Sequence, residues 1–211
     1  MIPPLAFLRA LAAAALLFLA APAFAAGTVM VFGDSLSAAY GLSEQEGWVS
    51  LLAERLAKAA PPWKVVNTSV SGETTAGGLS RLPPELERHR PAIVLIELGA
   101  NDALRGQPIA AIRANLERMI ALVRRSRAQP VLVGIMIPPN YGIDYAREFR
   151  ELYPAIARKE HVPFVPFLLA GVVEHDELFQ ADRLHPTAAA QPRILENVWA
   201  TLDPLLRKGA R

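Results

Sequence analysis

The chain of 211 residues contains no cysteine. This absence excludes disulfide frameworks, cysteine zinc sites, thiol nucleophiles and lipid anchors on cysteine. A large excess of charge of one sign is also missing, because 22 basic side chains stand against 20 acidic ones. Binding to nucleic acid requires clustered positive charge, so we expect no nucleic-acid partner.

Residues 1–26 differ from the rest of the chain, because Arg9 is their only charged side chain. Their composition predicts a secretory signal peptide. A stable membrane anchor is not expected, since the charge-free run 10–26 contains Pro22 and is shorter than the roughly 20 residues that a membrane span needs.

The small residues Ala23 and Ala25 occupy both specificity positions of a signal-peptidase site. We therefore expect residues 1–25 to be a signal peptide that is removed after Ala25, and residues 26–211 to form a single domain. An exported chain of this kind is expected in the periplasm or outside the cell.

Five apolar, mostly β-branched runs follow the N-terminal segment. They cover residues 28–32, 64–67, 93–98, 131–137 and 163–167. Each run is nearly continuous rather than alternating, which is typical of strands that are buried on both faces in a parallel sheet.

Helical patterns lie between these runs. They cover residues 47–59, 75–88, 109–125, 144–160 and a C-terminal stretch through 199–206, whose start Pro192 leaves open. Alternating strands and helices predict an α/β fold with three layers, α/β/α, around a doubly wound parallel sheet of five strands.

Small polar segments containing glycine follow three of the predicted strands: residues 33–37 (Gly-Asp-Ser-Leu-Ser), 71–74 (Ser-Gly-Glu-Thr) and 99–102 (Gly-Ala-Asn-Asp). Residues 182–187 then bring a carboxylate and an imidazole within three positions of each other. Functional residues of doubly wound sheets gather at the carboxyl ends of the strands. We expect these four segments to meet there.

Together these segments contain the parts of a serine hydrolase. Ser35 supplies a hydroxyl nucleophile, which needs a neighbouring imidazole as base, and His185 can provide it. Asp182 is placed to hold the other ring nitrogen. The backbone N–H groups of Ser35 and Gly72 and the side-chain amide of Asn101 are candidate donors to an oxyanion.

Each part also has a structural alternative. Ser35 could cap a helix, Asn101 could be an ordinary turn residue, and His185 could be a structural histidine before a proline. The joint occurrence of all the parts favours the hydrolase interpretation.

Three further histidines carry less information. His89 and His161 are expected at the amino ends of strands, and His175 lies in the acidic cluster 174–177, which is more typical of a solvated helix end than of a metal site. No His-Glu-x-x-His spacing occurs. We expect no metal site.

With these residues the sequence resembles the SGNH, or GDSL-type, hydrolase superfamily. Its four blocks are matched by residues 33–37, Gly72, residues 99–102 and Asp182-x-x-His185. Segments 104–106 (Leu-Arg-Gly) and 138–142 (Pro-Pro-Asn-Tyr-Gly) are similar to the periplasmic thioesterase I/lysophospholipase L1/arylesterase branch.

The resemblance implies a flavodoxin-like sheet, Ser35 as nucleophile, and hydrolysis of aryl esters, acyl thioesters and lysophospholipids. It also implies that no metal or cofactor takes part. The segment 138–142 matches a mobile loop over the acyl chain, so the candidate substrate-binding residues are Pro138, Pro139, Asn140 and Tyr141. We expect a monomer that acts on a small molecule.

Two rival functions stay open. A carbohydrate acetyl esterase of the same superfamily is one, although the apolar segment 135–139 favours acyl chains. A non-catalytic flavodoxin-like binding module is the other, but a phosphate-receiving version would need a lysine at the end of the fifth strand, where residues 164–167 (Phe-Val-Pro-Phe) have none.

Overall fold

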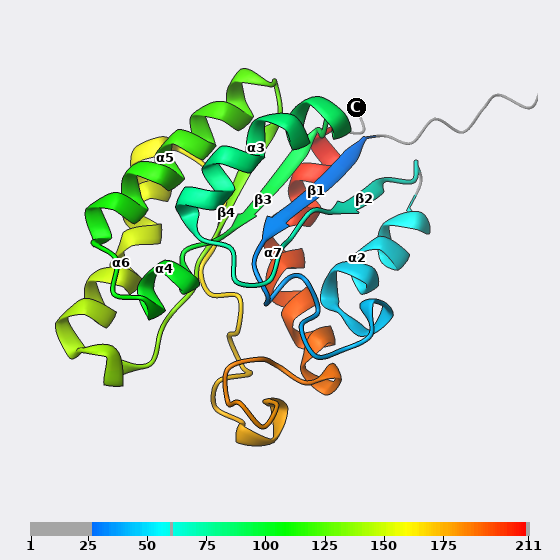
Figure 1. Ribbon diagram of the computed structural model, residues 1–211. Helices are drawn as coiled ribbons and strands as arrows, with labels where there is room; N and C mark the ends of the chain where they lie inside the picture. Colours follow the sequence, from blue (N-terminus) through cyan, green and yellow to red (C-terminus); the bar gives the residue numbers. More distant parts are fainter. Residues whose placement is uncertain (1–26, 60, 210–211) are drawn as a thin grey trace, which may run out of the picture.

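The computed structural model describes residues 27–59 and 61–209. Its centre is a parallel sheet of five strands in the order β2-β1-β3-β4-β5 (Figure 1). The strands are β1 (Thr28–Gly33), β2 (Lys64–Asn67), β3 (Ile93–Glu97), β4 (Gln129–Val133) and β5 (Phe164–Val165). The chain moves from β1 to one edge and then to the other, which confirms the predicted doubly wound sheet.

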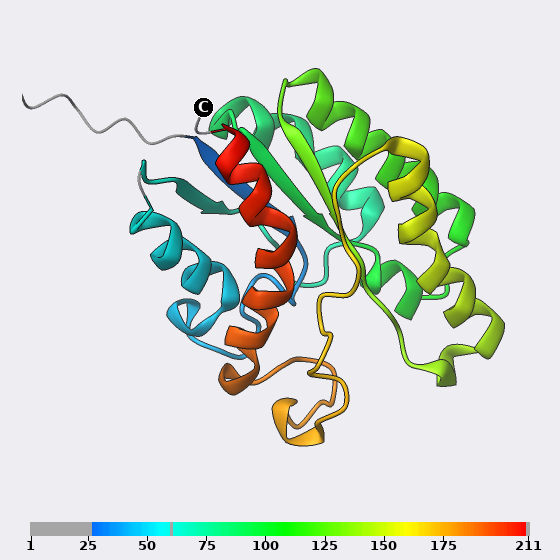
Figure 2. The ribbon, with the colours of Figure 1, turned by 180° about the vertical axis from the view of Figure 1, so that it is seen from behind.

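Helices cover both faces of the sheet, as Figures 1 and 2 show from opposite sides. One face carries α3 (Thr75–His89), α5 (Ile109–Arg125) and α6 (Ile143–Glu160), and the other carries α2 (Trp48–Ala57) and α7 (Gln191–Gly209). Shorter elements are α4 (Ala100–Leu104) and the 3-10 turns η1 (Glu44–Glu46), η2 (Pro139–Tyr141), η3 (Asp176–Leu178) and η4 (Ala188–Ala190).

The alternation of side chains along β1 explains how one strand serves two cores. Met30 and Phe32 pack under α3, α5 and α6, while Val29 and Val31 pack under α2 and α7. All four side chains are fully buried. Because neighbouring side chains of a strand point to opposite faces, a continuous apolar run is what a central strand in a three-layer fold requires.

The last two strands differ from the predicted runs. β4 ends at Val133 and not at residue 137, and the apolar chain beyond it leaves the sheet. β5 has only two residues, because Pro163 and Pro166 on either side have no N–H to donate to a ladder. Apolar sequence alone therefore overestimated both strands.

The start of α7 is settled by the structure. The helix begins at Gln191, so Pro192 lies in its first turn, where a missing N–H breaks no helical hydrogen bond. The proposed signal peptide, residues 1–25, lies outside the described residues. Among the described helices none is sufficiently long and apolar to span a membrane.

Gly134 allows the chain to turn away from the sheet after β4. Its N–H donates to the carbonyl of Val165 at 2.8 Å, and a side chain on Gly134 would collide with the carbonyl oxygen of Pro166. We expect Gly134→Ala to lower the free energy of unfolding by about 1–3 kcal/mol, because backbone must shift to admit the methyl group. Urea denaturation measures the change.

Arg118→Ala, on the exposed side of α5, is the control and is expected to stay within about 0.5 kcal/mol of the parent. Equal stability of Gly134→Ala and Arg118→Ala would contradict the packing described for this turn.

Candidate active site

The loops after β1, β2 and β3 lie side by side at the carboxyl edge of the sheet. Ser35 lies in the turn after β1, Gly72 lies between β2 and α3, and Asn101 lies in the first turn of α4, which directly follows β3. All three line one pocket of about 310 Å³, and His185 lines it as well. The structure thus brings together four residues that are spread over 150 positions of sequence.

Ser35, His185 and Asp182 form a continuous chain of hydrogen bonds. His185 Nε2 lies 2.8 Å from Ser35 Oγ, and His185 Nδ1 lies 2.7 Å from Asp182 Oδ2. These distances lie within the hydrogen-bonding range expected between a nucleophile, its base and the group that orients the base. No helix follows Ser35 directly, so it does not serve as a helix cap here.

Asp182 is held in its charged form. Partial desolvation raises the pKa of Asp182, but hydrogen bonds from the backbone and ring of His185 and from the Leu184 N–H outweigh it and lower the pKa to about 2. The carboxylate is therefore available to accept from the imidazole throughout the neutral and mildly acidic range.

His185 is carried by a long loop after β5 that folds back on itself. Phe179 pairs with Pro186 in an antiparallel bridge, and the Gln180 N–H donates to the His185 carbonyl at 2.8 Å. The Gln180 side chain also donates to the carbonyl of Tyr40, at 2.8 Å. The loop is therefore fastened to the segment that follows Ser35, which fixes the imidazole relative to the hydroxyl.

Tyr40 itself covers the imidazole. Its ring centroid lies 4.3 Å from that of His185, with the ring planes tilted by 36°. Tyr40 also lines the pocket, and half of its surface is exposed. Sequence reasoning did not select Tyr40, because a single aromatic residue five positions after a serine follows no periodic pattern.

Gly72 leaves the pocket open. Its φ of 78° lies in the left-handed region, which L side chains rarely adopt, and the place that a Cβ would occupy contains no atom within 4 Å. Glycine is therefore required by the backbone conformation, and a side chain here would project into open space.

The side-chain amide of Asn101 is oriented by the carboxyl group of Asp34. Its Nδ2 donates to Asp34 Oδ2 at 3.2 Å, and the second hydrogen of that amide remains free for another acceptor. Asp34 also accepts from the Leu36 N–H at 3.0 Å, so its side chain connects the turn that carries Ser35 to the side-chain amide of Asn101.

Asp34 and Glu97 form a buried acidic pair beneath the turn that carries Ser35. Glu97 Oε2 accepts from the Ser37 hydroxyl at 2.7 Å and from the Asp34 N–H at 3.2 Å. Burial raises the pKa of Asp34 to about 7, and burial, with repulsion from Asp34, raises the pKa of Glu97 well above its usual range. The sequence signal for this pair is the charge of Glu97, which ends the otherwise apolar strand β3.

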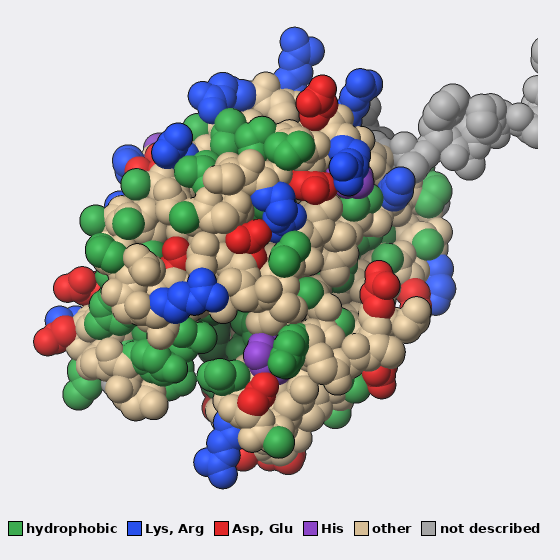
Figure 3. All heavy atoms as spheres, in the orientation of Figure 1, with side chains coloured by type: hydrophobic (Ala, Val, Ile, Leu, Met, Phe, Trp, Pro, Cys, Tyr) green, Lys and Arg blue, Asp and Glu red, His purple; other side chains and the backbone are tan. Residues whose placement is uncertain are grey.

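The rest of the pocket wall is apolar. It comes from the segment after β4 and from neighbouring loops: Leu36, Ala100, Leu104, Ile135, Met136, Ile137, Pro138, Leu169 and Leu184. A second cleft of about 400 Å³ shares Met136, Ile137 and Pro138 with it and extends toward Val173 and Phe179. Figure 3 shows hydrophobic side chains around the hollow on this face.

The predicted substrate-binding segment is only partly at the pocket. Pro138 lines it, whereas the exposed Asn140 and Tyr141 are not among the described residues of its wall. Pro139 begins the turn η2 together with these two residues.

The other histidines lie away from the pocket. His89 ends α3 and contacts Glu85 at 3.1 Å, His161 follows α6, and the exposed His175 lies 3.3 Å from Glu177. Within residues 27–59 and 61–209, no group of three or more His, Asp and Glu is arranged to hold a metal ion.

Several known proteins are similar to this chain over most of its length. Residues 31–192 match the GDSL-like Lipase/Acylhydrolase family. Esterase TesA of Pseudomonas aeruginosa is 51% identical over 182 residues, which cover 86% of this chain and 90% of that protein. Thioesterase 1/protease 1/lysophospholipase L1 of Escherichia coli K12 is 39% identical over 184 residues, with 87% of each protein covered.

A solved structure is also similar over most of its length. Psychrotrophic esterase EstA from Pseudoalteromonas sp., inhibited by monoethylphosphonate, matches with a TM-score of 0.81 and 38% identity, covering 85% of this chain and 98% of that one. The fold and relatives define an ester-bond hydrolase of the serine type. The chain belongs to the GDSL-like lipase/acylhydrolase family, which confirms the resemblance seen in its sequence.

The acidic pair predicts how stability depends on pH. Because the pKa of Glu97 is higher in the folded than in the unfolded chain, the folded state holds the proton more tightly. The free energy of unfolding should therefore decline as pH rises above the unfolded value of about 4. In Glu97→Gln, which keeps an acceptor for Ser37 and Asp34, this decline should be weaker.

Urea denaturation at a series of pH values between roughly 5 and 9 measures the effect. An equally steep decline in the parent protein and in Glu97→Gln would show that Glu97 does not titrate as described.

Proposed function

We propose that this protein is a serine esterase and thioesterase that cleaves acyl esters through an acyl-enzyme on Ser35. The observation behind the proposal is a chain of hydrogen bonds from Ser35 Oγ to the His185 imidazole and on to the Asp182 carboxylate, with Ser35 and His185 lining one pocket. A serine hydroxyl is a weak nucleophile at neutral pH, and this arrangement supplies the base that activates it.

In the proposed reaction, His185 Nε2 takes the proton of Ser35 as Oγ attacks the acyl carbon. His185 then donates that proton to the leaving alcohol or thiol, and an acyl-enzyme remains. Water then attacks the acyl-enzyme as the same nitrogen takes its proton, and the imidazolium returns that proton to Ser35 Oγ as the bond to the acyl carbon breaks. The carboxylic acid leaves and free Ser35 is restored. Asp182 orients the imidazole and stabilises its positive charge in both halves of the reaction.

The oxyanion formed in each half requires fixed donors. The Ser35 and Gly72 N–H groups and the free hydrogen of the Asn101 amide border the same pocket and are the proposed donors. Such groups lower the barrier because they are oriented before charge develops.

The substrates that we propose are small amphiphilic molecules, namely aryl esters, acyl thioesters and lysophospholipids. The apolar wall of the pocket, which continues into the second cleft, suits an acyl chain better than a sugar. The names of the relatives, an esterase TesA and a thioesterase 1/lysophospholipase L1, support these classes. We further propose that the mature protein, residues 26–211, is exported and monomeric. In this proposal Pro138 to Tyr141 lie near the acyl chain, and the reaction uses no cofactor or metal.

The proposal predicts one reactive serine. Treatment of residues 26–211 with a fluorophosphonate, followed by peptide mass spectrometry, should place a single adduct on Ser35 and abolish turnover of p-nitrophenyl esters. Ser35→Ala should lose turnover, whereas Ser71→Ala, a serine of the same pocket outside the hydrogen-bonded chain, should keep it.

A series of esters from acetyl to palmitoyl completes the test. Turnover of acetyl esters alone would favour the carbohydrate acetyl esterase. No adduct and no turnover would contradict the hydrolase mechanism and favour a binding module.

The oxyanion assignment predicts a specific kinetic change in Asn101→Ala. Removal of one donor typically lowers kcat by about 100- to 1000-fold. KM should change little, because the amide acts on charge that exists mainly in the transition state. Steady-state kinetics measures both constants, and a raised KM with unchanged kcat would mean that Asn101 only binds substrate.

A further inference from the structure

The loop that carries Gly72 has an exposed tip and firmly held ends. Near its start, the N–H of Gly33 donates to Ser69 Oγ at 3.0 Å, and the Val70 N–H donates to the Gly33 carbonyl at 3.0 Å. Ser71 and Gly72 follow and are exposed at the pocket. Any donor role of the Gly72 N–H therefore depends on what holds this tip in place.

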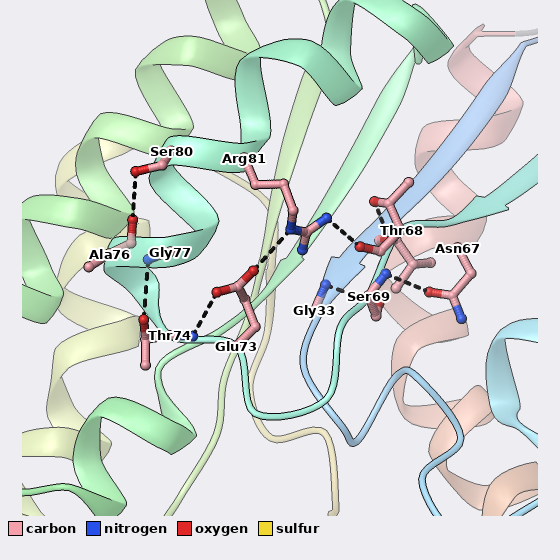
Figure 4. Close-up of polar contacts among 11 residues, drawn as sticks. Gly33, Asn67, Thr68, Ser69, Glu73, Thr74, Ala76, Gly77, Ser80 and Arg81 are labelled. Atoms are coloured by element: carbon pink, nitrogen blue, oxygen red, sulfur yellow. Dashed lines mark hydrogen bonds and ion pairs between the residues drawn. The ribbon is translucent and has the colours of Figure 1, made fainter.

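One guanidinium spans both ends of the tip (Figure 4). Arg81, which projects from α3, donates through Nη1 to the carbonyl of Thr68 at 2.7 Å and through Nε to Glu73 Oε2 at 2.9 Å. Glu73 directly follows Gly72, and its other oxygen accepts from the Thr74 N–H at 3.1 Å. The side chain of Arg81 thus binds the chain just before and just after the tip.

The same guanidinium also lies against the strand that leads to the nucleophile. Its central carbon is 4.3 Å from the ring centroid of Phe32, three residues before Ser35. Arg81 and Glu73 have exposed side-chain fractions of only 25% and 13%. A planar fork with several fixed donors can hold two acceptors and an aromatic face together, which a lysine cannot do.

We propose that Arg81 is a positioning residue that holds the oxyanion donor Gly72 in line with Ser35. It touches no substrate and acts through Thr68 and Glu73. The inference rests on the proposed function, because it concerns the oxyanion hole of that reaction. Free movement of the tip would displace the Gly72 N–H from the forming oxyanion, and a shift of about 1 Å is enough to slow an enzyme severely.

Gly77 offers a second way to disturb the contact between Arg81 and Glu73, which we call the clamp. A methyl group on Gly77 would collide with Glu73 Oε1, the oxygen that accepts from the Thr74 N–H, so Gly77→Ala should displace the carboxylate that Arg81 binds through Oε2. Alanine favours a helix more than glycine does, so this change should not weaken α3. Gly77→Ala therefore disturbs the contact between Arg81 and Glu73 without removing either side chain.

The test compares Arg81→Met and Gly77→Ala with Arg88→Met, an exposed arginine near the end of the same helix. Steady-state kinetics on p-nitrophenyl butyrate should show kcat lowered about 10- to 100-fold in the first two variants, with KM within about twofold of the parent. Arg88→Met should equal the parent.

A second readout uses an alkyl boronic acid, which forms a tetrahedral adduct on serine. Its inhibition constant should rise in proportion to the loss of kcat/KM, because both depend on the oxyanion donors. If Arg81→Met does not fold, Gly77→Ala decides the question by itself.

Unchanged kcat in folded variants, even with a lower Tm, would overturn the proposal and leave Arg81 a structural role. In that case the parent would still turn over ester and label at Ser35. A parent protein without turnover or label would instead refute the proposed function and the clamp with it.

Discussion

The parallel pairing of β1 between β2 and β3 is the constraint on which the site depends. Gly33 lies opposite Glu97, and Val31 lies opposite Asn67, so three strands end together at one edge. Neighbouring strands are about 4.8 Å apart, and the loops that follow them therefore begin within reach of a single substrate. Only a few residues after each strand are therefore needed to place Ser35, Gly72 and Asn101 around the same pocket.

The proposed base, His185, reaches this edge in a different way. β5 does not fix the position of His185, because the strand has only two residues and His185 lies twenty residues beyond it. The position of the imidazole depends on local interactions: the bridge of Phe179 with Pro186, the hydrogen bonds of Gln180 and the stacking of Tyr40. The loops at the end of the sheet thus supply the proposed nucleophile and oxyanion donors, while a folded-back loop supplies the proposed base. The two parts are joined through the Tyr40 carbonyl.

Strand number, sheet type and the four site segments could be predicted because each rests on a local pattern: continuous apolar runs, or glycine and polar residues at a strand end. The limits of β4 could not, since residues 135–138 are apolar because they line the pocket rather than continue the sheet. Gln180, Tyr40 and Arg81 were also out of reach. Each of the three acts on a partner that is distant in sequence or on a backbone carbonyl, and contacts of these two kinds produce no periodic pattern in the sequence. Glu97 could have been found, as a charge within a buried strand.

The proposed reaction requires the carboxyl edge of the sheet to hold Ser35, as nucleophile, and three oxyanion donors in fixed register. A crystal structure of the phosphonate adduct tests it most directly, because the phosphoryl oxygen occupies the place of the oxyanion. We expect an adduct on Ser35 whose oxygen lies about 2.7–3.1 Å from the Ser35 N, the Gly72 N and the Asn101 Nδ2. An adduct on another residue, or an oxygen that points away from these donors into solvent, would contradict it.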